Sequence, residues 1–227
     1  MPSPLARASV PDLVFAELCQ AILSGRYRPG DRLPTQRTLA AELEVNMSSI
    51  REALGRLEQL RLVETRHGDA TRVLDWRRSG GLEALALLGS AEPEVMGSLF
   101  EARRLLLREA ARLAAERRSP EQAAKLRELA DAFQSAPDGS TALTVDWEFM
   151  SALVEAAGNL VFQLIMNSVR ELYMPRAGAF ADIVADRANL AQLYAEAARA
   201  IDEGDADLAA ETLERLAAAQ QERLERG

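Results

Sequence analysis

The 227 residues are 48% hydrophobic but only 5% aromatic, which favours a helical protein with an apolar core, in one large or two small domains. The single cysteine, Cys19, excludes an internal disulfide and is expected to be a buried thiol in the first helix. No long apolar run occurs near the N-terminus, so we expect neither a signal peptide nor a membrane span, and a cytoplasmic protein.

The formal net charge of −8 at first argues against nucleic acid as a partner. The charge is, however, unevenly distributed. Residues 1–78 hold 12 arginines and 10 acidic side chains, a net charge of +2, which leaves −10 for the remainder. The acidic half need not touch DNA, so this asymmetry keeps a nucleic-acid-binding first half open.

Three short helices are predicted at the start of the chain. The first begins near Val10 and ends at Gly25, and the second covers residues 36–43. A turn at residues 44–46 follows, in which Asn46 suits the N-cap of a third helix. That third helix has one apolar stripe at helical spacing, formed by Ile50, Ala53, Leu54, Leu57 and Leu60.

A β-hairpin is predicted after the third helix. Two β-branched segments within residues 62–74 flank His67-Gly68-Asp69, where glycine permits a positive φ. Three helices and a hairpin, with a three-residue turn before the third helix, predict a winged helix-turn-helix over residues 1–75. The same elements could instead be a scaffold without a DNA-binding role.

The run LPTQRTLAAELEVNMSSIREALGRLEQLRLVETRHG resembles the DNA-binding domain of the GntR family of bacterial transcription regulators. The resemblance implies that the winged helix binds double-stranded DNA and assigns DNA contacts to Arg37, Met47, Ser48, Ser49, Arg51 and His67. One of these departs from the family pattern. Met47 stands where the family usually has an arginine that reads guanine, and a thioether cannot form that bidentate hydrogen bond.

The rest of the chain is predicted to be all α-helical. The pattern breaks over residues 76–81, which we interpret as a linker to an effector-binding and dimerisation domain over residues 82–227. Seven helices are expected there. The first starts at Leu82, and the others start near Pro93, Pro120, Thr141, Leu160, Asp186 and Asp205. A break is expected at Pro175.

This helical half resembles the effector domain of the FadR branch of the GntR family, and within it the regulators of fatty-acid metabolism. The linker and the run GNLVFQLIMNSVRELY, residues 158–173, fit that pattern. Many relatives in the branch bind a metal ion with one aspartate and three histidines. The corresponding positions here are Asp146, Met150, Tyr194 and Leu216, so we expect no metal and no other cofactor.

The resemblance and the residue types suggest a small set of candidate ligand contacts, namely Arg103, Asp146, Asn159, Tyr173 and Tyr194. Each also has a structural interpretation: a surface charge for the arginine, capping or core polar groups for Asp146 and Asn159, and packing for the tyrosines. Ala217, Gln220 and Leu224 depart from the residues that the branch has near coenzyme A.

Together these features predict a regulator and not an enzyme, since nothing resembles a phosphate loop, a metal cluster or a nucleophile with a histidine base. The resemblance implies a homodimer at a palindromic operator, controlled by a long-chain acyl-CoA or free fatty acid without a metal. The alternative is a metal-independent sensor of a small organic acid. A long apolar tunnel would favour the acyl chain, and a compact polar pocket the organic acid.

Overall fold

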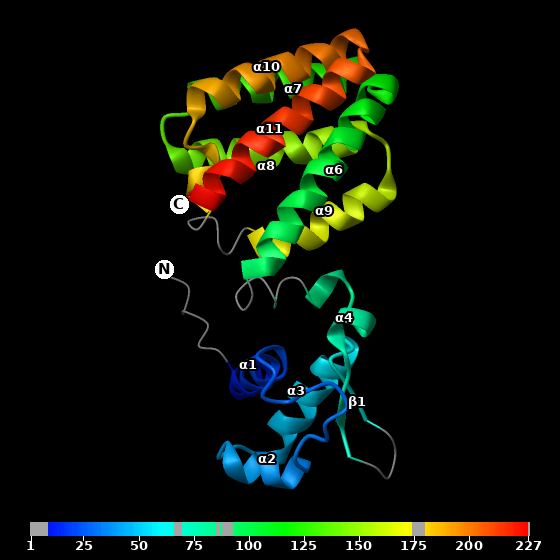
Figure 1. Cartoon of the computed structure of the whole chain (residues 1–227), viewed down its shortest axis with the longest axis vertical. Helices are drawn as coiled ribbons and strands as arrows, with labels where there is room; N and C mark the ends of the chain where they lie inside the picture. The colour runs from blue at the N-terminus through cyan, green and yellow to red at the C-terminus, as the bar shows by residue number, and fades with distance from the viewer. Residues whose placement is uncertain (1–8, 66–69, 85–86, 88–92, 174–179, 227) are drawn as a thin grey trace, which may run out of the picture. The chain divides into compact units, whose positions relative to one another are not determined.

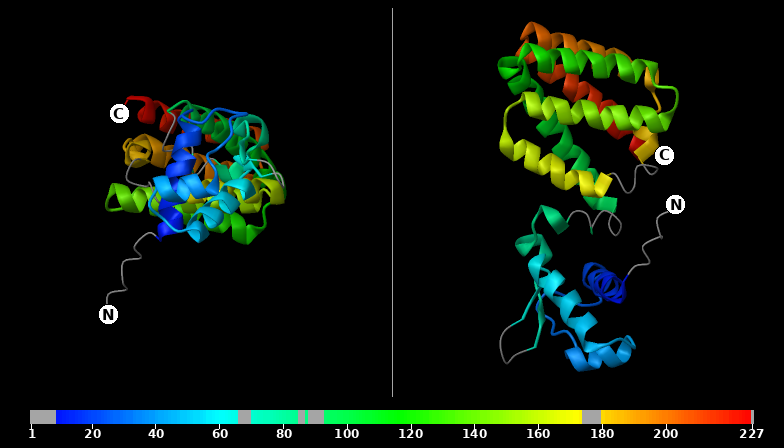
Figure 2. Two further views of the ribbon diagram at one scale, coloured as in Figure 1. Left: turned by 90° about the horizontal axis from the view of Figure 1, so that it is seen from below. Right: turned by 180° about the vertical axis from the view of Figure 1, so that it is seen from behind.

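The computed structural model describes residues 9–65, 70–84, 87, 93–173 and 180–226. The chain divides into two compact units, Met1–Pro93 and Glu94–Gly227, and each is described by itself. Both units can be followed in Figure 1, and in two further views in Figure 2. Within the described residues, no helix is long and apolar enough to cross a membrane.

The first unit contains the predicted helices and hairpin. Helices α1 (Val10–Leu23), α2 (Gln36–Glu42) and α3 (Met47–Gln59) are followed by the antiparallel strands β1 (Val63–Glu64) and β2 (Arg72–Val73), in which Val63 pairs with Val73. The expected turn at His67-Gly68-Asp69 lies outside the described residues. The segment expected as a linker holds α4 (Trp76–Ser79), and a 3₁₀ turn, η1 (Leu82–Ala84), follows it.

Helix α1 packs across α3 and supplies much of the core of this unit. Its N-terminus has a capping box between Ser9 and Asp12. Asp12 also accepts a hydrogen bond from Arg56 of α3 at 2.7 Å, and these hydrogen bonds lower the pKa of the Asp12 carboxyl to about 2. Two turns further along α1, Cys19 is 4% exposed, and burial raises the pKa of its thiol to about 11.

The second unit is a helical bundle. Its helices are α6 (Pro93–Arg117), α7 (Pro120–Ser135), α8 (Gly139–Ala156), α9 (Leu160–Tyr173), α10 (Arg187–Glu203) and α11 (Ala206–Arg226). Helix α7 packs against α8 and α10, and α10 packs against α11. Gly204, with φ +81°, ends α10 in the left-handed conformation and starts the turn into α11. The predicted fold class, a winged helix-turn-helix followed by an all-α domain, is confirmed.

Helix α9 is held less tightly than its neighbours. None of its described side chains, residues 160–170, is fully buried. Its inner face is half-buried, whereas Leu160, Val161 and Leu164 are 67%, 61% and 54% exposed. Few apolar contacts therefore resist a displacement of this helix. The expected break at Pro175 lies outside the described residues.

Candidate DNA interface and effector cavity

The turn before α3 fixes the N-terminus of this helix. Glu44 has a positive φ of 54°, and the backbone N–H of Val45 donates to the carbonyl of Ala40 at 3.0 Å, so the chain reverses within three residues. Asn46 is the predicted N-cap. Its side-chain oxygen accepts from the backbone N–H of Ser49 at 2.8 Å and from the Ser49 hydroxyl at 3.1 Å.

The predicted DNA contacts do not all share one exposed face. Arg37 on α2 and Ser48 and Arg51 on α3 are exposed, and Met47 at the start of α3 is half-buried. Ser49 is only 4% exposed, because its hydroxyl is turned back to the cap. These positions suit phosphate or base contacts for the exposed side chains and a structural role for Ser49. His67 lies outside the described residues.

In the second unit, a network of polar side chains lies within the apolar core. The Asp146 side chain is 3% exposed, and its Oδ1 atom accepts hydrogen bonds from the Tyr194 hydroxyl and, at 2.7 Å, from the amide of Gln220. These residues come from α8, α10 and α11. Tyr194 is fully buried, and its ring lies 4.4 Å from that of Phe133 and 4.8 Å from that of Phe149, measured between centroids. Asp146 thus joins three helices.

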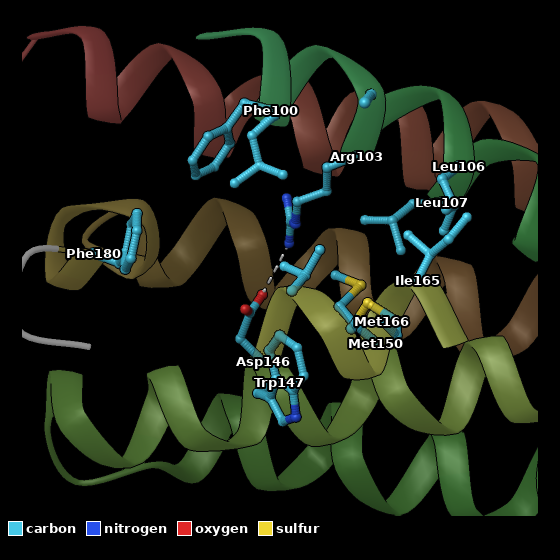
Figure 3. A pocket seen from close by; sticks show the side chains of 13 residues that line it. Phe100, Arg103, Leu106, Leu107, Asp146, Trp147, Met150, Ile165, Met166 and Phe180 are labelled. Atoms are coloured by element: carbon cyan, nitrogen blue, oxygen red, sulfur yellow. Dashed lines mark ion pairs between the residues drawn. The ribbon is translucent and has the colours of Figure 1, made fainter. Parts of the chain in front are cut away.

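Arg103 of α6 supplies the positive charge beside this carboxylate. Its Nη2 atom lies 3.7 Å from Asp146 Oδ1, an ion pair without a short hydrogen bond (Figure 3). The side chain is 19% exposed, and its buried Nη1 atom has no hydrogen-bond partner among the described residues. A desolvated guanidinium with a free donor can accept a further anionic oxygen.

Arg103 and Asp146 lie in the wall of a cavity of about 90 Å³ between α6, α8 and α9 (Figure 3). The remaining lining side chains are apolar: Leu99, Phe100, Ala102, Leu106, Leu107, Trp147, Met150, Ile165, Met166, Val169 and Phe180. The cavity is smaller than the roughly 300–1,000 Å³ of typical ligand pockets. The cavity is thus compact, as expected for a sensor of a small organic acid, but apolar, as expected for a sensor of an acyl chain.

Asn159 and Tyr194 are not among the side chains that line the cavity. Asn159 is the cap of α9, and its side-chain oxygen accepts from the backbone N–H groups of Val161 and Phe162 at 3.0 and 3.4 Å. Tyr194 reaches the cavity only through Asp146. Tyr173 ends α9, and its side chain lies outside the described part of the chain. Of the predicted residues whose side chains the structure describes, Arg103 and Asp146 line the cavity.

The four positions that correspond to metal ligands do not fit a metal ion. Met150 and Leu216 are buried apolar side chains, and the phenol of Tyr194 donates to Asp146. A single carboxylate whose oxygen already accepts from neutral and cationic donors lacks the set of nitrogen, sulfur or oxygen ligands that Zn²⁺ or Ni²⁺ requires. Side-chain hydrogen bonds satisfy Asp146 instead.

The sequence interpretation missed Gln220 as a partner of Asp146, although it singled out the position. Gln220 is fully buried, and its Oε1 atom has no hydrogen-bond partner among the described residues. A signal was present in the sequence. Gln220 continues the apolar stripe of α11, formed by Ala209, Leu213, Leu216 and Ala217, and a polar side chain in such a stripe needs a buried partner. The contribution of α9 to the cavity was also missed.

Comparison with known proteins gives a consistent result. Residues 12–73 match the model of the bacterial regulatory proteins of the gntR family, and residues 98–219 match the FCD domain. The chain is 37% identical to the HTH-type transcriptional regulator Mce2R of Mycobacterium tuberculosis, over 89% of this chain and 86% of that protein. It is 30% identical to the fatty acid metabolism regulator protein of Serratia proteamaculans, over 70% and 68%. The likeness to fatty-acid regulators is thus present at lower identity.

Among solved structures, the chain is similar to that of Lar, which controls the expression of the Listeria monocytogenes agr system. The two share 18% identity, with a TM-score of 0.62, over 98% of this chain and 99% of that one. This likeness supports the same fold.

Proposed function

The chain belongs to the GntR family of bacterial transcription regulators, and on that premise we propose that a fatty acyl ligand in its helical domain controls binding to operator DNA. As a member of this family with an FCD domain, the protein is a DNA-binding regulator and not an enzyme. The finer proposal concerns what the helical domain senses. The Serratia relative is named as a regulator of fatty-acid metabolism, and this name supports an acyl ligand.

The observation that carries the proposal is the composition of the cavity wall. All but two of the lining side chains are apolar, and the two polar ones form one ion pair. A ligand with an apolar body and one anionic or carbonyl oxygen matches this wall, since the oxygen can meet the free Nη1 donor of Arg103. Burying a methylene contributes about 0.8 kcal/mol, or roughly fourfold in affinity.

An acyl chain requires more room than the cavity of about 90 Å³ offers. A movement of helix α9 can provide this room. The helix lines the cavity with Ile165, Met166 and Val169, and none of its described side chains is fully buried. We therefore expect α9 to move outward when ligand binds. A ligand acts as a signal only through such a difference between states. No metal takes part in this proposal.

A small organic acid remains the second candidate, because the cavity is compact and Arg103 offers an unpaired donor. The two candidates differ in chain-length dependence. For an acyl sensor, affinity rises with each methylene until the cavity is full, whereas a small-acid sensor loses affinity once the body exceeds a few carbons.

On the DNA side, the proposed assembly is a homodimer that binds a palindromic operator. One winged helix makes few phosphate contacts, and a two-fold pair doubles them. The exposed side chains of Arg37, Ser48 and Arg51 are the proposed contacts, together with Met47 and the wing residue His67.

The test titrates operator-bound protein with C8, C12 and C16 acyl-CoA, free fatty acids and small carboxylic acids. The readouts are fluorescence anisotropy of the DNA and calorimetry with and without chelator. Val169→Trp, which fills the cavity, should abolish acyl binding. Val161→Trp, on the exposed face of the same helix, is the matched control and should leave binding unchanged. Failure of every acyl ligand to bind, or loss of binding with chelator, would overturn the proposal.

A further inference from the structure

The first turn of α3 has an accessible apolar side chain among polar ones. Met47 is the first residue of the helix and follows the N-cap Asn46. It is half-buried, so part of its side chain packs against the domain and the rest is accessible. Ser48, next to it, is exposed, and so is Arg51, one turn further along the same side of the helix. A thioether therefore lies beside a hydroxyl and a guanidinium at the start of α3.

Few other side chains of this turn are free to contact DNA. The Ser49 hydroxyl donates to the N-cap at 3.1 Å, and Ile50 is fully buried in the core. Of the first five residues of α3, this leaves Met47, Ser48 and Arg51 with accessible side chains. Helical side chains lean towards the N-terminus, and the N-terminal residues of a recognition helix are those that contact base edges. Met47 is therefore placed to contact a base.

The chemistry of a thioether limits which base it can contact favourably. In the major groove all base pairs present hydrogen-bond donors or acceptors, and thymine alone adds an apolar group, its 5-methyl. Methionine has no donor and its sulfur is a weak acceptor, so the side chain gains little from the polar base edges. Against guanine or cytosine it would cover a polar group without replacing the hydrogen bonds that water makes there. The favourable partner that remains is the thymine methyl.

We propose that Met47 contacts the 5-methyl group of a thymine in each operator half-site and so selects a T·A pair at that position. This inference rests on the proposed placement of α3 in the major groove and goes beyond it, because it identifies the base that the helix selects. The contact is apolar and needs no fixed hydrogen-bond geometry, which suits an unbranched side chain with three rotatable bonds. Removing one methyl group from the interface should weaken binding about fourfold.

The test removes the methyl group from the DNA and the thioether from the protein. The native full-length protein first selects its operator from random duplex DNA, and each thymine of the half-site is then replaced in turn by uracil. Uracil lacks only the 5-methyl group and keeps the O4 acceptor of thymine. In a complementary series, the T·A pair is replaced by C·G with and without a 5-methyl group on the cytosine. Fluorescence anisotropy of the DNA gives each Kd.

Two variants remove the apolar contact in different ways. Met47→Ala shortens the side chain, whereas Met47→Gln keeps its length and ends it in a polar amide. Gln59→Ala, at an exposed position at the other end of α3, is the matched control. Circular dichroism checks that each variant retains its helices, and each variant is compared on the thymine and the uracil operator, so that a general loss of affinity cancels.

For the native protein and for Gln59→Ala, we expect uracil at one position to raise the Kd about fourfold in one half-site and roughly fifteenfold in both, and methylation of cytosine there to lower it about fourfold. Both Met47 variants should bind the thymine and uracil operators equally. If no uracil weakens native binding, or if the Met47 variants keep the native ratio, the inference is overturned, and the placement of α3 stands provided that Arg51→Ala abolishes specific binding. If Arg51→Ala binds the selected operator as the native protein does, the placement of α3 fails and the inference fails with it.

Discussion

Replacing Tyr194 with phenylalanine would test the buried network of the helical domain with a change of one oxygen atom. The ring, which packs between Phe133 and Phe149, stays in place, so the variant creates no large cavity. What is lost is the O–H donor to the carboxylate of Asp146, leaving the amide of Gln220 and the more distant guanidinium of Arg103. A hydrogen bond to a charged group contributes about 1.5–3 kcal/mol, so we expect the helical domain to lose about 2 kcal/mol.

Urea unfolding measures this loss. The chain has two tryptophans, Trp76 in the first unit and Trp147 in the second, so a Trp76→Phe background makes emission specific to the helical domain. Tyr194→Phe should lower the midpoint without changing the slope. Tyr27→Phe, in the first unit, is the control and should leave this transition in place. A loss below about 0.5 kcal/mol would refute the view that the buried side chain of Asp146 depends on this hydroxyl.

Three further predictions concern the DNA-binding domain. Arg51→Ala should abolish specific operator binding in a mobility-shift assay while the fold stays intact. Arg26→Ala, at another exposed position, is the control and should still bind. If both variants bind the operator equally well, α3 is not the recognition helix. Met47→Arg should select guanine at one position of each half-site, a discrimination of about 1–3 kcal/mol, and an unchanged selected sequence would exclude Met47 from the groove. Asn46→Ala should destabilise the domain by about 1 kcal/mol in thermal denaturation, because the N-cap hydrogen bond is lost. Ser48→Ala is the control and should change the stability little. If both variants lose the same stability, Asn46 does not act as the cap.

The signals that the sequence contains are strongest where structure is determined locally. Asn46 was predicted as a cap from its place before an apolar stripe, and it caps α3. The last two helices were predicted to start near Asp186 and Asp205, and Gly204 ends α10 with a positive φ just before α11 starts at Ala206. Caps, periodicity and turn glycines act within one or two turns of helix, and this is why the elements of both units could be predicted.

The partners within the effector site could not be predicted in the same way. Tyr194 and Gln220 lie 48 and 74 residues from Asp146 along the chain, and periodicity does not specify which helices face each other. The same limit explains Ser49 and Asn159. Both are short polar residues at helix starts, where capping and ligand contact predict the same residue types, and only the hydrogen-bond geometry separates the two roles.

The buried thiol of Cys19 has a consequence for kinetics. Because burial raises its pKa to about 11, only on the order of one molecule in ten thousand carries the thiolate at pH 7, and the sulfur is shielded from solvent as well. A thiol-specific reagent therefore reacts when the first unit opens and hardly otherwise. Since the chain has no other cysteine, the labelling rate reports the opening of the winged helix alone. Operator DNA that binds only the closed form must slow that rate in proportion to its occupancy. The rate of Cys19 labelling therefore measures the fraction of the winged helix that is bound to operator DNA.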